Sequence, residues 1–137
     1  MNHSFKNKRI LVVDYNTDSR ELLSVLFEQE QAQVLSVSSA REALEVYEDF
    51  QPDILLCELL LPGEDGYWLI RRIRSLEAKR GRQSSAIAVT VAASEQDRQL
   101  ALAAGFDSHI AKPLKVDDLL AIAAIVEDSQ RCPQLAQ

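Results

Sequence analysis

The sequence predicts an α/β fold in which helices cover both faces of a parallel β-sheet. Three short segments are apolar without interruption, at Ile10–Val13, Ile54–Cys57 and Ala86–Val89. Strands that are apolar on both sides belong in a sheet that is buried on both faces. Longer segments with helical spacing of apolar residues lie between them. Strict alternation of this kind indicates right-handed βαβ units, so we expect a single doubly wound sheet.

Two weaker segments complete a set of five strands. Val34–Val37 alternates between apolar and polar residues, so we expect it near an edge of the sheet, and His109–Ala111 is a short final strand. Five successive βα units, written (βα)5, favour a flavodoxin-like fold with strand order 2-1-3-4-5.

Each of the first four predicted helices has a start signal. In chain order, the expected signals are Asn16 or Thr17, Ser39 with Glu42 as a capping box, Asp65, and Ser94 with Asp97. Gly105 is expected to end the fourth helix in a left-handed conformation, and the last helix is expected over 116–126.

The composition limits the classes of partner. The chain has 137 residues, which suits one domain, and its 21 acidic and 15 basic residues give a net charge of −6. A nucleic-acid backbone would require a basic surface, so we expect no nucleic-acid partner. No apolar segment reaches the ~18–20 residues that span a membrane. The apolar segment that follows Arg9 ends at Val13, which is too short for a signal peptide. We therefore expect a cytoplasmic protein without a membrane partner.

Four polar residues follow four different predicted strands. They are Asp14, Glu58, Thr90 and Lys112. Ligands of open parallel sheets bind beyond the carboxyl ends of the strands, where the strand order reverses. These four side chains are therefore expected to converge at one edge and to form the functional site.

These residues and their contexts resemble the receiver domains of bacterial two-component systems. The resemblance covers about Arg9 to Val126. It implies that Glu58 lies at the phosphoacceptor position and that Thr90 and Lys112 contact the phosphoryl group. It also implies that Asp14, residue 58 and the backbone carbonyl of Leu60 form a Mg²⁺ site, and that Thr90 and residue 109 are switch residues.

Three positions depart from the family pattern. Tyr15 replaces the second acid of the metal-binding pair, Glu58 replaces the usual aspartate, and His109 replaces the switch aromatic residue. Mg²⁺ requires near-ideal octahedral oxygen coordination, and these changes remove one carboxylate and displace another. We therefore expect no cofactor, with Mg²⁺ bound weakly at most.

The departures leave three interpretations open within the family. Glu58 can imitate part of the phosphorylated state, giving a phosphomimetic or phosphorylation-independent module, although one carboxylate carries less charge than a phosphoryl group. The chain can also be a scaffold that lost its switch through sequence drift and kept only its fold. It can also be a receiver that a histidine kinase still phosphorylates. From another class, a small flavodoxin-like enzyme or nucleotide binder could use Asp14 and Lys112, but the loop 14–17 contains no glycine to approach a phosphate.

The resemblance also implies how the domain would act. We expect an N-terminal extension over 1–8, a receiver-like domain over 9–126 and a flexible tail over 127–137. We expect binding rather than enzymatic activity. The partner would be a histidine kinase, another receiver or an output protein, and the contact surface would be about 94–126.

Overall fold

Five strands alternate with five helices. The computed structural model describes residues 4–131. The strands are β1 (Arg9–Val13), β2 (Gln33–Val37), β3 (Ile54–Cys57), β4 (Ser85–Thr90) and β5 (Ser108–Ala111). The helices are α1 (Thr17–Gln29), α2 (Ala40–Phe50), α3 (Gly66–Arg80), α4 (Glu95–Ala104) and α5 (Val116–Arg131). Every predicted strand and helix is present, and the boundaries differ by a few residues.

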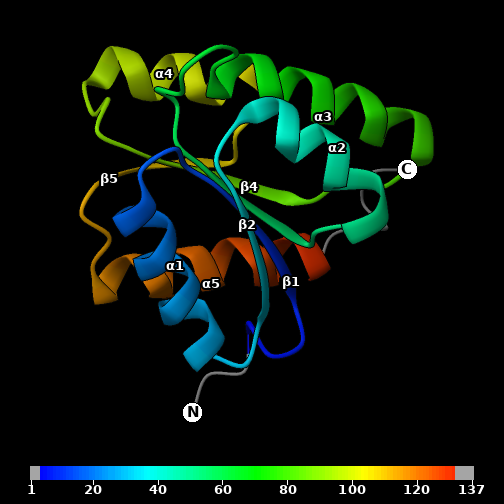
Figure 1. Cartoon of the computed structure of the whole chain (residues 1–137). Coiled ribbons are helices and arrows are strands. Elements are labelled where there is room, and N and C mark those ends of the chain that lie inside the picture. The colour runs from blue at the N-terminus through cyan, green and yellow to red at the C-terminus, as the bar shows by residue number, and fades with distance from the viewer. Residues whose placement is uncertain (1–3, 132–137) are drawn as a thin grey trace.

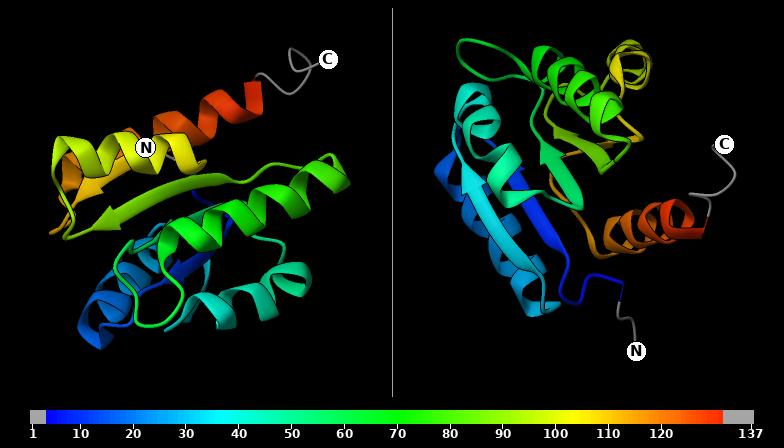
Figure 2. Two further views of the ribbon diagram at one scale, coloured as in Figure 1. Left: turned by 90° about the horizontal axis from the view of Figure 1, so that it is seen from above. Right: turned by 90° about the vertical axis from the view of Figure 1, so that its right-hand side faces the viewer.

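The strands form one parallel sheet with the order β2-β1-β3-β4-β5, which confirms the predicted flavodoxin-like topology. Helices α2, α3 and α4 cover one face and α1 and α5 cover the other (Figure 1). Helix α3 lies between α2 and α4 on its side of the sheet (Figure 2). The apolar side chains of the three central strands are buried on both faces, which explains why their sequences are uninterrupted.

The helix starts follow the predicted capping signals. Asn16 caps α1, Asp65 caps α3, and Ser94 with Asp97 forms a reciprocal capping box on α4. Ser39 caps α2, but Glu42 accepts the backbone N–H of Ser38 at 2.9 Å instead of that of Ser39, so the predicted box is only half formed.

Gly105 ends α4 with a φ of 132°, a conformation that L side chains rarely adopt. A Cβ at this position would also lie 3.0 Å from Cγ of Arg74. The predicted glycine stop is therefore confirmed, and the close packing of Arg74 gives a second reason for glycine.

The N-terminal extension contributes to the core. Phe5 is 2% exposed and packs edge-on against Phe27 of α1, with the ring centroids 5.0 Å apart. The backbone N–H of Asn7 donates to the carbonyl of Gln31 at 2.9 Å. The segment before β1 is thus held against the end of α1, which the sequence pattern did not reveal.

The flexible tail that we predicted over 127–137 is wrong for residues 127–131, because α5 continues to Arg131. Val126 is buried, and Glu127 accepts a hydrogen bond from Ser4, so the helix is supported beyond residue 126. Residues 132–137 lie outside the described part. Among the residues described, no helix has the length and apolar character needed to cross a membrane.

Candidate functional site

The carboxyl ends of the strands bring the four predicted site residues together. In the sheet, Val13 of β1 pairs with Cys57 of β3, and Cys57 pairs with Ala88 of β4. Asp14 and Glu58 are the next residues after β1 and β3, so they lie at the same level at the ends of neighbouring strands. The sheet bonding continues one residue further, because the N–H of Glu58 donates to the carbonyl of Val13 at 2.9 Å. The backbone therefore fixes where both acidic side chains start.

Gly66 at the start of α3 also sets the position of Glu58. Its N–H donates to the carbonyl of Leu59 at 3.0 Å, which brings α3 directly onto this segment. A Cβ on Gly66 would lie 2.7 Å from the backbone oxygen of Glu58. Only glycine permits such an approach without displacing one of the two backbones.

The carboxylate of Glu58 is buried and fully hydrogen-bonded. Its residue is 2% exposed. Oε1 accepts from the N–H of Leu60 at 3.1 Å and from the hydroxyl of Thr90. Oε2 accepts from the N–H of Val91 at 3.3 Å and lies 2.9 Å from Nζ of Lys112. A carboxylate offers about four acceptor positions, so these four donors leave none for another ligand.

Lys112 bridges the two acids of the site. Its Nζ lies 2.6 Å from Oδ2 of Asp14 as well as 2.9 Å from Oε2 of Glu58. The second oxygen of Asp14 accepts the N–H of Asn16 at 3.0 Å. Burial alone would lower the pKa of Lys112, but its hydrogen bonds to the carboxylates of Asp14 and Glu58 outweigh this effect and raise the pKa. The lysine is therefore held as a cation between two buried anions.

A chain of hydrogen bonds runs from Glu58 to the edge strand β5. The hydroxyl of Thr90 donates to Glu58 and accepts the N–H of Ala92 at 2.9 Å. Nε2 of His109 lies 2.8 Å from the carbonyl of Ala92. A carbonyl can only accept, so Nε2 carries the proton in this contact. The two predicted switch positions, Thr90 and His109, thus both hydrogen-bond to Ala92 in the loop between β4 and α4.

The residues proposed for a metal site do not fit Mg²⁺ in this arrangement. Tyr15 is 54% exposed and lies outside the group of hydrogen-bonded site residues. The ammonium of Lys112 occupies the place between Asp14 and Glu58 where a shared cation would lie. No group of three or more His, Cys, Asp or Glu side chains with metal-binding geometry occurs within residues 4–131. The Lys112 ammonium offsets one of these two negative charges and lies between the carboxylates, which weakens the attraction of the site for a divalent cation.

Cys57 precedes Glu58 and is fully buried. Its thiol lies 3.2 Å from the backbone oxygen of Glu58. Burial, with further contributions from the negative charges of Glu58 and Asp14, raises the pKa of the Cys57 thiol. Since the thiolate is the reactive form, the residue has a packing role and not a chemical one.

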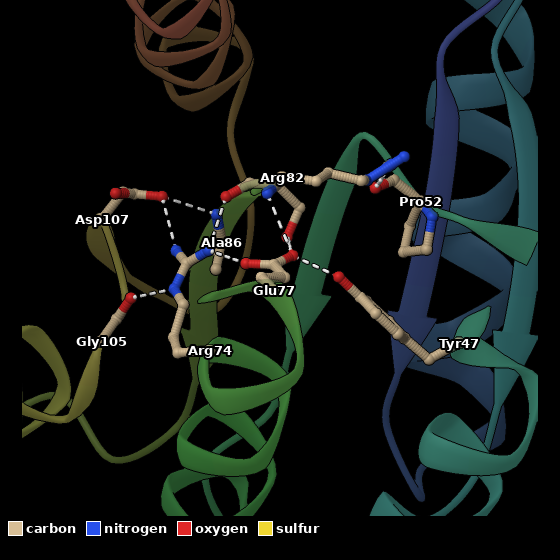
Figure 3. Close-up of polar contacts among 9 residues, drawn as sticks. Tyr47, Pro52, Arg74, Glu77, Arg82, Ala86, Gly105 and Asp107 are labelled. Carbon is tan, nitrogen blue, oxygen red and sulfur yellow. Dashed lines mark hydrogen bonds and ion pairs between the residues drawn. The ribbon is translucent and has the colours of Figure 1, made fainter. Parts of the chain in front are cut away.

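A second buried polar cluster lies at the opposite end of the sheet (Figure 3). Glu77 on α3 accepts from the Tyr47 hydroxyl and from the N–H and hydroxyl of Ser84, at 3.0 and 2.7 Å. Arg74 donates to Glu77 at 2.7 Å and to Asp107 at 3.0 Å. Burial and the neighbouring Glu77 raise the pKa of Tyr47. One feature of the sequence points to this cluster, because Glu77 lies on the apolar stripe of α3, four residues after Ile73.

Comparisons with known proteins identify the family and the fold of the chain. A family model described as the response regulator receiver domain matches residues 10–124. A 14.6 kDa protein encoded in the sodA1 3′ region of Leptolyngbya boryana is 40% identical over 111 residues, which are 81% of this chain and 83% of that protein. The virulence transcriptional regulatory protein PhoP of Shigella flexneri is 34% identical over 113 residues, 82% of this chain. The chain spans 49% of the length of PhoP.

A similar solved structure is the receiver domain of the histidine kinase CKI1 from Arabidopsis thaliana, complexed with Mg²⁺ and BeF₃⁻. It is 26% identical with a TM-score of 0.79, and the match covers 90% of this chain and 92% of that one.

Proposed function

The chain belongs to the response regulator receiver domain family, and from this premise we propose that it signals in a fixed state that Glu58 maintains in place of phosphorylation. One observation carries the proposal. The Glu58 carboxylate already bonds the Thr90 hydroxyl and the Lys112 ammonium, the two groups that the family resemblance assigns to the phosphoryl group. A covalent side chain thereby supplies the anion that a receiver otherwise acquires by reaction.

The arrangement disfavours phosphoryl transfer to Glu58. Attack requires a carboxylate oxygen that faces the donor, and charge neutralisation for the transferred group. Both oxygens of Glu58 are engaged by four donors, and Lys112 is shared with Asp14. A phosphoryl group would have to displace these contacts. We therefore propose that the protein acts by binding and has no enzymatic activity.

A scaffold that kept only its fold would not require Glu58 to form specific contacts. A glutamate left by drift is expected to turn toward water, because burying a charge without partners is costly. Glu58 instead is buried with its charge paired, and its contacts continue through Thr90 to the loop before α4. This continuity supports the phosphomimetic interpretation.

The surface that would read this state is α4–β5–α5, within about 94–126. Large apolar side chains are exposed on its two helices, and they are Leu100, Leu102, Val116 and Leu120. We propose that this surface binds a histidine kinase, another receiver or an output protein in the cytoplasm.

The test is the substitution Glu58→Gln, which keeps the shape of the side chain and removes its charge. We expect amide chemical shifts to change across 94–126, and stability to fall by about 1–3 kcal/mol, since the partly buried Lys112 loses a charged partner. Glu28→Gln, at an exposed position on α1, is the matched control. Shift changes confined to the immediate neighbours of residue 58 would contradict a fixed signalling state.

A second arm of the same test uses acetyl phosphate with Mg²⁺ and intact-mass spectrometry. We expect no phosphorylated protein. A mass increase of one phosphoryl group that is lost in Glu58→Gln would show that the site still reacts.

The double substitution Tyr15→Asp with Glu58→Asp restores two acids, and we expect it to bind Mg²⁺ more tightly than the native chain.

A further inference from the structure

Helix α3 carries a basic face in an acidic protein. Trp68, Arg71, Arg72, Ser75 and Lys79 follow the spacing of one helical stripe. Arg71, Arg72, Ser75 and Lys79 are exposed, and the only acidic residue of the helix, Glu77, is buried on the opposite side. The net charge of the whole chain is −6, so this face has the opposite sign to the molecule as a whole.

Two arginines lie at Trp68, the single tryptophan of the chain. The guanidinium carbons of Arg72 and Arg41 lie 4.7 and 5.4 Å from the centroid of its ring. Two like charges at one ring repel each other, and an anion bound between or beside them would relieve this repulsion. The indole ring adds an aromatic surface to the same place.

Little of this charge is neutralised within the protein. Arg41 pairs with Glu64 at 3.2 Å, but both side chains are exposed and such pairs are weak, so a carboxylate of a partner can compete for this arginine. Arg71, Arg72 and Lys79 form no ion pair with any other residue in the range 4–131. An excess of positive charge therefore remains available to a partner.

We propose that this face, formed by Trp68, Arg71, Arg72, Lys79 and Arg41, docks an acidic segment of a protein partner. Guanidinium groups bind carboxylates through two parallel hydrogen bonds, which suits aspartate and glutamate side chains. A long nucleic acid is densely negative along its whole length, so it would also lie against the acidic remainder of the molecule and be repelled there. A short acidic segment meets only the basic face, since charges beyond about 8 Å are screened at physiological salt.

This surface is separate from α4–β5–α5, which the proposed function uses. The binding predicted for the basic face therefore does not depend on whether Glu58 maintains a fixed signalling state.

The test is a titration with a synthetic peptide of about twelve residues in which half are glutamate, followed by the fluorescence of Trp68 and by calorimetry. We expect a saturable change that weakens as salt is added, because the contacts are electrostatic. A peptide with glutamine at each glutamate position should produce no change. Absence of saturable binding by the glutamate peptide would overturn the proposal.

Matched charge reversals separate the basic face from net charge. Arg71→Glu with Arg72→Glu should weaken binding by about tenfold or more, whereas Lys6→Glu with Lys115→Glu makes the same change in net charge at exposed sites elsewhere and should have a small effect. Equal weakening in both double variants would refute a specific surface. Tighter binding of a single-stranded oligonucleotide of equal charge would refute a protein partner. Arg71→Ala with Arg72→Ala is the alternative variant if the reversal impairs folding.

Discussion

At the scale of single residues, Lys112 sets the charge balance of the site formed by Asp14, Glu58 and Thr90. Its ammonium is the only side-chain cation within salt-bridge distance of Asp14 and Glu58 among residues 4–131. Both acids are buried, and they share this one cation as their ion-pair partner. Replacing Lys112 therefore has a larger effect than its partial exposure alone would suggest.

We expect Lys112→Met to lower the free energy of unfolding by about 3–5 kcal/mol, because it leaves two buried carboxylates without a cation. Urea unfolding at pH 7 measures the change. Lys115→Met removes an exposed lysine nearby and serves as the control, with an expected effect within about 0.5 kcal/mol.

The stability difference between the native chain and Lys112→Met should depend on pH in a predictable direction. The pKa of Lys112 is raised in the folded protein, so its contribution to stability is complete below the unfolded-state value of about 10.4. The contribution is lost as the pH rises through the higher folded-state value. The stability difference between the native chain and Lys112→Met should therefore remain constant from pH 7 to about 10 and shrink above it. A difference that falls between pH 7 and about 9 would contradict this assignment.

At the scale of elements, Arg74 connects α3 to the segment between α4 and β5. Its guanidinium donates to the carbonyls of Gly105 and Ser84, at 2.9 and 2.7 Å, and to the carboxylates of Glu77 and Asp107 (Figure 3). Asp107 in turn accepts the N–H of Ala86 on β4 at 2.8 Å. The end of α4 is thereby fixed to α3 and β4.

We expect Arg74→Met to destabilise the fold by about 3–5 kcal/mol, since the buried Glu77 loses its cation. Tyr47→Phe removes one hydrogen bond to Glu77 and should cost about 1–3 kcal/mol. Hydrogen exchange should quicken at 104–108 in Arg74→Met but not in Tyr47→Phe, because only arginine contacts that segment. Arg71→Met, on the exposed side of the same helix, is the control. Unchanged exchange at 104–108 in Arg74→Met would refute the proposed connection.

Sequence patterns predicted these elements better than the contacts between them. The uninterrupted apolar runs such as Ile54–Cys57 follow directly from burial on both faces. Caps such as Asp65 are local, since the bond to Trp68 spans three residues. The cluster around Glu77 joins residues that are 30 positions apart in the case of Tyr47. Periodicity within one helix contains no information about such a partner.

The site shows the same limit. The convergence of four residues could be predicted because each follows a predicted strand, and the topology places the strand ends at one edge of the sheet. These residues are Asp14, Glu58, Thr90 and Lys112. The sharing of Lys112 between two acids, and the contact of His109 with a carbonyl of the neighbouring loop, depend on side-chain geometry that spacing does not encode.

At the scale of the whole molecule, the segment before β1 closes the face of the sheet that α1 and α5 cover. Phe5 lies in the same apolar cluster as Phe27 and Val126. Ser4 donates to Glu127 at the end of α5. The predicted boundaries separated these segments from the domain because 1–8 is largely polar and 127–131 lacks apolar periodicity, yet a hydrogen bond joins Ser4 to Glu127.

We expect Phe5→Ala to lower the free energy of unfolding by about 3–5 kcal/mol, the range found when a buried phenylalanine is truncated. Thermal and urea unfolding both report it. Phe5→Leu fills most of the volume and should recover more than half of the loss. An effect below about 0.5 kcal/mol would show that the segment packs on the core without stabilising it.

The anion of the site is the side chain of Glu58 and thus part of the polypeptide, and under the proposed function this has a consequence for timing. A phosphoryl group gives a signal with a lifetime, because hydrolysis ends it. The carboxylate of Glu58 cannot be removed by a phosphatase, so each molecule is active from the moment it folds. The strength of the signal would then follow the number of copies in the cell, and only degradation or dilution by growth would end it.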